Sequence, residues 1–455
     1  MKKLLIFLVF TTTFIQAQYT VNATITTPLN TDWVILYRID NGKQKFVKNT
    51  TIRKDTLLVE GKKQIIGTFT FTLPKNTPKG YYRTSYKTEG NGFVDFIFNK
   101  ENVRFAFHPD YPEQTAIFSE SEENIIYKNY LNEITTKQQI LDSLQINAIQ
   151  NPALSLSKNY KKTLAGIKKI QQKYLEKTEG MYVQPFVKAT LRANPEELKT
   201  TVENYMSNIT NTFFDNMDFS NKTLINSSFL INRIADYIFY INYSDNKEKQ
   251  QELYKSSIKT VFSKTKDILF KKEAIVFLIE EFEATKNLEI IDFLFENYYD
   301  KLPRGLQNQD FVEEKKTLFA SEVGRIAPDF SWKENGKKLN LSTLKGAENF
   351  ILVFWSTGCS HCLKEIPELY NYLQENTKVK VIAFAMERNN LAWNSMKVNL
   401  PNWHHVLGLN KWENKIARTY NIMATPSYFL LDKNKKIIAK PEELKDLKKL
   451  VENLK

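Results

Sequence analysis

The chain has 455 residues, of which 42% are hydrophobic and 25% are charged, a composition that allows sizeable buried cores and excludes a disordered protein. At roughly 150 residues per domain, this length indicates two to four domains. The net charge of +13 comes from lysines scattered along the chain without a nucleic-acid motif, so no nucleic-acid partner is expected. These lysines indicate solvated surface charge, with weak attraction to an anionic membrane surface as the alternative.

The first 17 residues have the pattern of a secretory signal peptide. Lys2 and Lys3 form its positive region, residues 4–15 its apolar region, and Ala17 its cleavage end. The apolar region is about a dozen residues long, whereas a membrane-spanning helix needs roughly 20. No cysteine lies near residue 17 to carry a lipid. We therefore expect an exported protein of the periplasm or cell envelope; an uncleaved N-terminal anchor is the alternative.

Residues 18–118 have the pattern of short β-strands. Phe69, Phe71 and Leu73 alternate with threonines, which is the period of a strand with one buried face. Turn-forming residues separate this segment from further candidate strands at residues 33–37, 81–86, 93–98 and 103–107. Several short alternating strands of this kind predict an antiparallel β-sandwich domain.

At Ser119 the hydrophobic period changes from 2 to about 3.6. Between residues 119 and 320, apolar stripes such as Leu230, Ile234 and Ile238 recur at helical spacing, and glycine is scarce. We find no repeat of fixed period, which argues against a solenoid. This stretch is therefore predicted to be a helical domain.

Between residues 325 and 455, candidate strands alternate with helical segments. The strands are expected at residues 350–355, 379–385, 427–432 and 436–439, and a terminal helix at 442–454. Strands separated by helices imply β-α-β crossovers and a sheet with parallel pairs. We predict an α/β domain here, so that the whole chain is a multidomain protein.

Cys359 and Cys362 are the two cysteines of the chain, and they form a Cys-x-x-Cys pair directly after the apolar run 350–355. Such a pair is a redox couple or half of a metal site. An exported protein that keeps two close cysteines and no others is typical of a redox enzyme; an inert disulfide is the alternative.

A zinc site needs four ligands, and the chain offers four histidines besides the two cysteines. We therefore expect no metal and no cofactor. His404 and His405 are expected in a surface loop, with a metal or substrate contact as the alternative.

A helix that begins at Cys359 places that sulfur at the helix N-terminus. The first-turn N–H groups and the macrodipole favour thiolate over thiol there. Cys359 is therefore the expected attacking thiol, and Cys362, one turn further along, is the expected buried thiol that resolves a mixed disulfide.

Three motifs carry a family resemblance. Residues 354–367 (FWSTGCSHCLKEIP) resemble the active-site segment of the thioredoxin superfamily, and residues 424–432 (ATPSYFLLD) its cis-proline loop and following strand. Residues 327–330 (APDF) with 341–346 (LSTLKG) are similar to the TlpA/ResA branch of exported thiol-disulfide oxidoreductases. The resemblance covers about residues 324–455 and implies a thioredoxin-like fold with thiol-disulfide exchange activity.

Two weaker resemblances lie upstream. Residues 121–124 (SEEN) and 211–220 (NTFFDNMDFS) resemble a poorly characterised region often fused to such modules in Bacteroidetes-type proteins. They imply architecture rather than activity.

The resemblance also implies site residues. Pro426 matches the cis-proline that faces the redox pair, and a peptide can dock on the main chain of Thr425 by strand-like pairing. Glu365 matches the active-site glutamate of the ResA-like branch, and is the expected proton acceptor for Cys362 because thioredoxin's buried aspartate is replaced by Val353. The alternative for Glu365 is a helix-surface charge.

His361 lies between the two cysteines. If protonated, it stabilises the Cys359 thiolate and makes the couple more oxidising, and strongly oxidising relatives carry histidine there. The alternative is a solvated side chain that tunes little. We place it with Thr425 and Pro426 among the expected substrate-binding residues.

The sequence departs from two related patterns, the usual thioredoxin-family motif and the peroxiredoxin motif. Gly358 stands where the family usually has tryptophan, so an aromatic wall beside the first cysteine is missing. A peroxiredoxin would carry proline and threonine at the places of Leu352 and Ser356, which excludes that class.

The resulting expectation is an exported thiol-disulfide oxidoreductase that reduces disulfides in exported proteins and receives electrons from an unidentified membrane or periplasmic donor. A disulfide oxidase or isomerase is the enzymatic alternative, suggested by His361. A partner-binding protein whose redox pair is secondary is the alternative of a different class.

Overall fold

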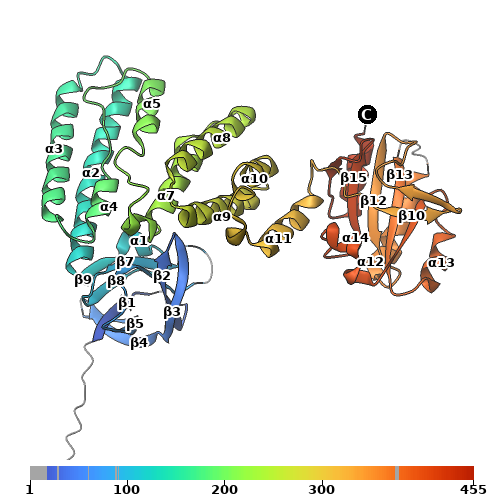
Figure 1. The fold of residues 1–455 in the computed structure, drawn as a ribbon, viewed down its shortest axis with the longest axis horizontal. Helices are drawn as coiled ribbons and strands as arrows, with labels where there is room; N and C mark the ends of the chain where they lie inside the picture. Colours follow the sequence, from blue (N-terminus) through green and yellow to red (C-terminus); the bar gives the residue numbers. More distant parts are fainter. Residues whose placement is uncertain are drawn as a thin grey trace, which may run out of the picture. The chain divides into compact units, whose positions relative to one another are not determined.

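The computed structural model describes residues 18–454 other than 28–29, 60, 88–89, 91 and 375–378 (Figure 1). The predicted signal peptide, residues 1–17, lies outside the described residues. The chain divides into two compact units, one ending at Leu306 and the other beginning at Gln307. In the described part of the chain, no helix combines the length and apolarity needed to span a bilayer.

The N-terminal unit begins with a β-sandwich. One sheet has the strand order β4-β5-β1-β8-β9 and the other the order β3-β2-β6-β7. A single hydrophobic core lies between them and includes Val21, Leu36, Phe71 and Phe96, drawn from both sheets. The strands are β1 (Gln18–Ile25), β2 (Trp33–Asp40), β3 (Lys43–Thr51), β4 (Arg53–Val59), β5 (Lys62–Pro74), β6 (Gly80–Ser85), β7 (Phe93–Phe98), β8 (Val103–Phe107) and β9 (Ile117–Glu120).

The sequence predicted an antiparallel sandwich, but the observed sandwich contains one parallel pair of strands. β1 pairs in parallel with β8, in a register that sets Ala23 against Phe105. An alternating pattern reports which face of a strand is buried, but not the direction of the neighbouring strand.

The same unit contains helices, of which α1 precedes β9 and the others follow the sandwich. They are α1 (Pro112–Thr115), α2 (Glu122–Gln150), α3 (Ser157–Lys177), α4 (Gln184–Ala189), α5 (Val202–Thr212), α6 (Lys222–Ile225), α7 (Phe229–Ala235), the π-helix η1 (Asp236–Ile241), α8 (Lys247–Lys264), α9 (Ile268–Ala284), α10 (Leu288–Leu294), the π-helix η2 (Phe295–Tyr299) and the 3-10 turn η3 (Arg304–Leu306).

Buried polar side chains join the helices to the sandwich. The Asn124 side chain, at the start of α2, accepts from Ile97 N at 2.8 Å and donates to Ile97 O at 2.7 Å. The Arg83–Asp95 pair of the sheet, with N–O distances of 2.6 and 2.8 Å, receives a 2.8 Å hydrogen bond from Ser228 before α7. Because unpaired buried polar groups are costly, these bonds hold the two parts in one arrangement.

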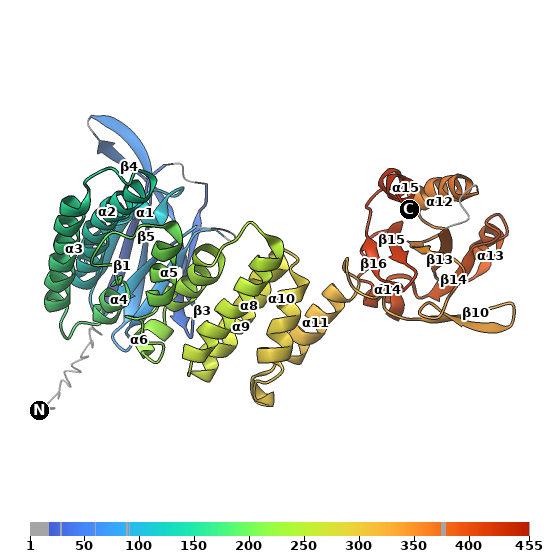
Figure 2. The same ribbon diagram turned by 90° about the horizontal axis from the view of Figure 1, so that it is seen from above.

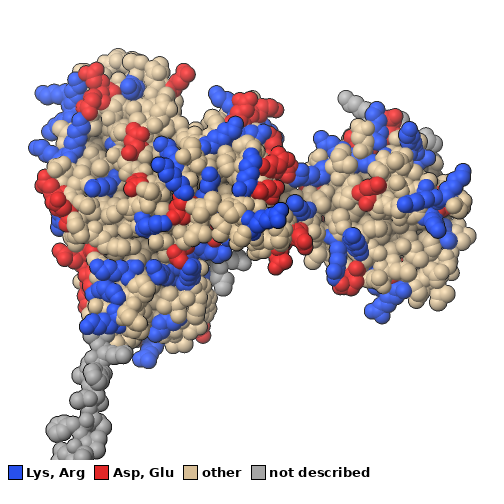
Figure 3. All heavy atoms as spheres, in the orientation of Figure 1, with Lys and Arg blue, Asp and Glu red and all other residues tan. Residues whose placement is uncertain are grey.

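The charged side chains of this unit are dispersed. On the face drawn in Figure 3, lysine and arginine side chains are interspersed with acidic ones rather than gathered into one basic stripe. This distribution agrees with lysines that serve as solvated surface charge.

The C-terminal unit is built on a five-stranded sheet of order β14-β13-β12-β15-β16. β13 and β14 run parallel to β12, while β15 pairs antiparallel with β12 and β16 pairs antiparallel with β15. The strands are β12 (Asn349–Trp355), β13 (Val379–Glu387), β14 (His404–Leu409), β15 (Ser427–Asp432) and β16 (Ile437–Ala439). The sequence did not predict β14, nor the hairpin of β10 (Ser331–Glu334) and β11 (Lys337–Asn340).

Helices cover both faces of this sheet (Figure 2). Val353 on one face of β12 packs in a core with residues of α12 (Ser360–Leu373) and α15 (Leu444–Glu452). Phe354 on the opposite face packs in a second core with residues of α14 (Lys415–Thr419) and the β10–β11 hairpin. This two-sided burial explains the continuous apolar run in the sequence. The remaining helical elements are α11 (Gln309–Ala320), α13 (Leu391–Lys397) and the 3-10 turn η4 (Lys411–Glu413).

The segment between α11 and the sheet is bonded to the C-terminal unit. Ser321 Oγ donates to Tyr420 O at 2.9 Å, Gly324 N donates to Ile437 O at 2.8 Å, and Lys440 pairs with Glu322 at 2.7 Å. A domain limit near residue 325, as expected from the sequence, would remove these bonds. The limits at 118 and near 320 stay predictions.

We expect a fragment of residues 307–455 to fold alone, and a fragment of residues 325–455 to fold with a free energy of unfolding lower by about 1–3 kcal/mol, since each lost hydrogen bond is worth roughly 1 kcal/mol. Urea unfolding of both fragments, followed by circular dichroism, measures the difference. Equal stability would mean that α11 and residues 321–324 contribute nothing to this unit.

Candidate functional site

The two cysteines lie where strand β12 passes into helix α12. β12 ends at Trp355, and Cys359 is the N-cap residue of α12. The Cys359 sulfur accepts a hydrogen bond from Cys362 N at 3.3 Å and donates its thiol hydrogen to Thr425 O at 3.1 Å. Cys359 therefore lies just beyond the carboxyl end of the central strand, at the N-terminus of the following helix.

The two thiols have different surroundings although they are one turn apart. Both are free, Cys359 is partly exposed, and Cys362 is fully buried. Cys362 belongs to the core on the α12 side of the sheet, together with Val353 and Ile366. An attacking reagent therefore reaches the first sulfur and not the second.

The pKa values of the two thiols are shifted in opposite directions. Partial burial would raise the pKa of Cys359, but hydrogen bonds to its sulfur from the Cys362 thiol, from the side chain of Thr425 and from the backbone of Cys362 and His361 outweigh burial and lower it. For Cys362, burial raises the pKa to about 12, with a further contribution from the hydrogen bond to Cys359. Cys359 is therefore the thiol that ionises first.

The Thr425-Pro426 peptide bond is cis and precedes strand β15. Both residues are half-buried, and Thr425 O lies beside the Cys359 sulfur. The structure thus brings together Cys359, Cys362, Thr425 and Pro426, four of the six predicted site residues.

Glu365 lies on α12, one turn after Cys362, and is half-buried. Its Oε2 accepts a 2.8 Å hydrogen bond from the hydroxyl of Tyr428, a buried residue of β15 that pairs with Val353. Burial raises the pKa of Tyr428, and the hydrogen bond to Glu365 and the nearby Cys362 raise it further. Tyr428 therefore remains a protonated donor next to both groups.

Sequence reasoning missed Tyr428. A tyrosine in the buried strand that follows the predicted cis-proline was an available signal, because a buried phenol needs a hydrogen-bond partner. The partner is 63 residues away in the chain.

A second carboxylate was also missed. Glu387, buried at the end of β13, accepts a hydrogen bond from Thr357 N at 2.5 Å, and Ser356 Oγ accepts one from Gly358 N at 3.2 Å. These bonds hold the loop before Cys359. The sequence prediction ended this strand at residue 385, which left Glu387 outside it.

The histidines take separate positions. His361 is exposed on the first turn of α12. His404 and His405 lie on β14, so the expectation of a surface loop is wrong; His404 Nδ1 is 3.0 Å from Glu334 Oε2, and His405 Nε2 is 2.9 Å from Leu400 O. Within the part of the chain that is described, no three His, Cys, Asp or Glu side chains are grouped to hold a metal.

Comparisons with known proteins agree on the C-terminal unit. Residues 323–440 match the profile of the AhpC/TSA family. The chain is 34% identical over 134 residues to the thiol-disulfide oxidoreductase ResA of Bacillus thuringiensis (strain Al Hakam), an alignment that covers 29% of this chain and 73% of the relative. ResA of Bacillus subtilis (strain 168) is 31% identical over 119 residues, covering 25% of this chain and 64% of the relative.

Two solved structures are also similar. A domain of a possible thiol-disulfide isomerase from Cytophaga hutchinsonii is 31% identical and matches with a TM-score of 0.26, covering 29% of this chain and 90% of that one. A thioredoxin-like protein from Bacteroides caccae is 17% identical with a TM-score of 0.28, covering 58% of this chain and 98% of that one.

In the folded, reduced protein, we expect iodoacetamide to label Cys359 with a pH midpoint below 9.0, the ordinary value for a thiol. The rate follows the thiolate fraction, so a lowered pKa moves its rise to lower pH. Cys362 should stay unlabelled until the pH approaches about 12. Mass spectrometry of labelled peptides measures both, with labelling in urea as the control in which both cysteines react. Equal labelling of the two in the folded protein would contradict the assignment.

Proposed function

The chain belongs to the ResA family of thiol-disulfide oxidoreductases, and we propose that it acts outside the cytoplasm, in the periplasm or cell envelope, as a reductase of disulfides in exported proteins. The observation that carries the proposal is the contrast between an accessible thiol of lowered pKa, Cys359, and a buried thiol of raised pKa, Cys362. Such a contrast assigns the order in which the two sulfurs react.

In the proposed reaction, the Cys359 thiolate attacks one sulfur of a partner's disulfide and releases the other sulfur as a thiol. Cys362 then loses its proton and attacks Cys359, which releases the partner's second thiol and leaves a Cys359–Cys362 disulfide. The partner gains two electrons and two protons, and an exported or membrane electron donor later returns the pair to the dithiol.

The second attack needs a proton acceptor, because the Cys362 thiol ionises with difficulty in its buried setting. We assign this role to Glu365, which is one helical turn away and is oriented by the Tyr428 hydroxyl. General-base assistance typically contributes 10²–10⁴-fold.

Thr425, Pro426 and His361 border the accessible sulfur and form the proposed docking site for the partner. An extended peptide segment can pair with the Thr425 main chain. The exposed His361 side chain is free to contact the bound segment or to modulate the Cys359 thiolate. Peroxide reduction is not proposed, since Leu352 and Ser356 occupy the places where a peroxiredoxin carries proline and threonine.

One observation favours the formation of disulfides in partner proteins, which is the opposite direction of exchange. Hydrogen bonds that lower the pKa of Cys359 also stabilise the reduced form, which makes a couple more oxidising. A disulfide oxidase or isomerase is therefore the second candidate, and His361 would strengthen it.

We expect Cys362→Ala to accumulate mixed disulfides with exported proteins, because the attack that releases them is lost, and Cys359→Ser to accumulate none. Non-reducing gels and mass spectrometry of the captured partners measure this. If Cys359→Ser retained the protein's role in the cell, a partner-binding protein with a secondary redox pair would be the better account. Equilibration with glutathione gives the direction: a potential near or above about −200 mV favours the oxidase or isomerase, and a much lower value the reductase.

We expect Glu365→Gln to slow turnover about 10²-fold near neutral pH, with the deficit shrinking as the pH rises toward about 12, where Cys362 ionises without help. Stopped-flow disulfide reduction from pH 5 to 9 measures the profile. Glu368→Gln is the matched control, because Glu368 is an exposed carboxylate of the same helix that pairs with Lys448. Tyr428→Phe should give a smaller deficit of the same pH dependence. An unchanged profile for Glu365→Gln would make Glu365 a surface charge.

A further inference from the structure

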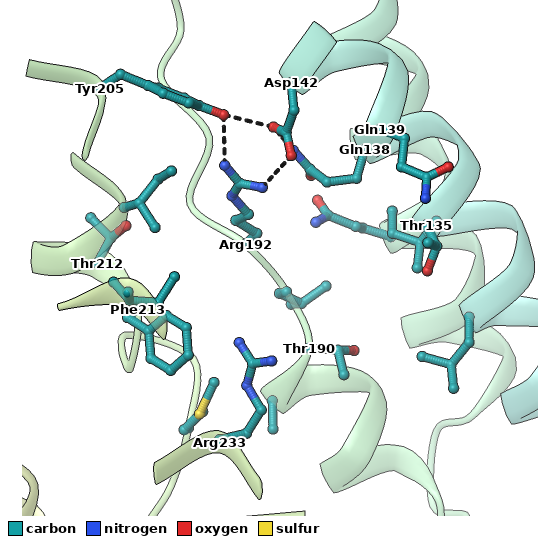
Figure 4. A pocket seen from close by; sticks show the side chains of 18 of the residues that line it. Thr135, Gln138, Gln139, Asp142, Thr190, Arg192, Tyr205, Thr212, Phe213 and Arg233 are labelled. Carbon is teal, nitrogen blue, oxygen red and sulfur yellow. Dashed lines mark hydrogen bonds and ion pairs between the residues drawn. The ribbon is translucent and has the colours of Figure 1, made fainter. Parts of the chain in front are cut away.

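The two arginines that line a cavity of the N-terminal unit are paired with carboxylates. This cavity of about 550 Å³ lies between α2, the segment after α4, and the helices α5 and α7 (Figure 4). Arg192 Nη1 donates to Asp142 Oδ2 at 2.7 Å, and Arg233 Nη1 donates to Asp236 Oδ2 at 2.8 Å. Arg233 and Asp236 also line a second cavity, beside strand β7 of the sandwich. Neither arginine is therefore left to attract an anion.

One lysine of the C-terminal unit is placed differently. Lys411 lies in the 3-10 turn η4 and is half-buried, and among the described residues its ammonium group has no ion-pair or hydrogen-bond partner. Its nitrogen lies 3.5 Å from the point that a β-carbon on Gly358 would occupy. Because Gly358 directly precedes Cys359, this nitrogen is no more than about 9 Å from the Cys359 α-carbon. Lys411 is thus a neighbour of the attacking thiol.

The parallel strands of the sheet explain this position. β12, β13 and β14 run in the same direction, so the segments at their carboxyl ends lie side by side. Gly358 follows β12, Glu387 ends β13, and Lys411 follows β14. Ligands of open α/β sheets bind outside these ends of the strands. A partner that reaches Cys359 therefore approaches the side of the sheet on which Lys411 lies.

The backbone of η4 holds Lys411 in an uncommon conformation. Asn410 and Lys411 have φ angles of 71° and 46°, in the left-handed region that disfavours residues with a β-carbon. Asparagine is tolerated there because its short side chain bonds locally, an advantage that lysine lacks. Asn414 Nδ2 donates to Leu409 O at 2.9 Å across the turn. Backbone outliers of this kind are concentrated at functional sites, where the surrounding structure maintains them.

Carboxylates near Lys411 are engaged by other groups. Glu387 is buried and accepts a hydrogen bond from Thr357 N at 2.5 Å. Glu413, in the same turn as Lys411, pairs with Arg418. Lys411 therefore presents a positive charge without an ion-pair partner at the edge of the redox site.

We propose that Lys411 is a specificity-determining residue, which selects partner disulfides that have an acidic residue next to the reacting cysteine. The inference rests on the proposed attack of Cys359 on a partner's disulfide. A carboxylate that docks over Gly358 would pair with the half-buried ammonium, where solvent screens the attraction less than at an exposed surface. Gly358 stands where the family usually has tryptophan, and a large side chain there would compete with the ammonium for this space.

The test uses peptides of the form Gly-Xaa-Cys-Xaa-Gly, blocked at both ends, with glutamate, alanine or lysine as Xaa. The cysteine carries a neutral 2-thiopyridyl disulfide. Attack of Cys359 on the peptide sulfur releases 2-thiopyridone, whose absorbance gives the rate for the reduced full chain. Division by the rate of 2-mercaptoethanol with the same peptide removes the intrinsic reactivity of each disulfide.

The glutamate peptide should react about fivefold faster than the alanine peptide at low salt, and the lysine peptide slower than both. These differences should shrink below roughly twofold in about 1 M NaCl, because salt screens the ion pair. If the original chain showed no preference for the glutamate peptide, the proposal would be wrong. No reaction with any peptide would instead overturn the attack by Cys359, and this proposal with it.

Variants of Lys411 test the contact. Lys411→Met removes the charge at similar side-chain length and should react with the three peptides at rates within roughly twofold of one another, while Lys411→Arg should keep their order. Lys436→Met is the matched control and should keep the full preference. Lys436 is an exposed lysine in the turn after β15, at the end of that strand far from Pro426. If Lys411→Met, folded by circular dichroism, kept the preference, the assignment would fail.

Variants of Gly358 test the same contact from the other side. Gly358→Ala should keep the preference, because a β-carbon 3.5 Å from the Lys411 nitrogen is an ordinary contact. Gly358→Trp should lower the preference, because its side chain displaces the ammonium. An undiminished preference in Gly358→Trp would show that the carboxylate does not dock over residue 358.

Discussion

Burial of strand β12 on both faces is the constraint around which the C-terminal unit is organised. All seven of its residues are buried, and residues 350–355 alternate between a core under α12 and α15 and a core under α14 and the β10–β11 hairpin. A strand of this kind must be central and flanked by helices, since neither face tolerates water. The strand ends at Trp355, so the following turn and Cys359 lie at the carboxyl end of the sheet. Reactive groups of α/β folds commonly lie at this end of the strands.

The same arrangement gives two neighbouring thiols opposite properties. α12 starts at the sheet edge and packs back onto the core, so its N-cap sulfur is accessible and its next turn is buried. Lowering the pKa of Cys359 speeds the first attack at neutral pH, but it also stabilises the reduced state. Raising the pKa of Cys362 slows the second attack and destabilises the reduced state. Glu365, held by the Tyr428 hydroxyl, is the proton acceptor that we propose for this second attack. The direction of exchange depends on the balance of these effects rather than on either cysteine alone.

In the N-terminal unit, buried polar contacts join the helices to the β-sandwich. The redox pair lies in the other unit and takes no part in these contacts. Asn124, Asp95 and Ser228 bind the helices to the sandwich through buried hydrogen bonds. Residues 121–124, which carry a resemblance to Bacteroidetes-type proteins, therefore have a structural function in this fold. Arg233, five residues after Ser228, lines two cavities of the same unit. The two cavities and the redox centre thus lie in separate compact units of one chain.

The amino-acid sequence by itself determined the features that depend on neighbouring residues. The apolar run 350–355, the Cys-x-x-Cys pair after it and the proline at 426 marked the strand, the helix start and the loop, because periodicity and turn chemistry act over a few residues. The change of period near Ser119 likewise separated the strand-rich part from the helical part. Tertiary structure alone decided which distant groups meet. Examples are Tyr428 with Glu365, Glu387 with Thr357, β1 with β8, and the helices α2, α5 and α7 around one cavity of the N-terminal unit. A hydrophobic pattern reports that a residue is buried, but its partner is selected by the packing of whole elements, which no local pattern encodes.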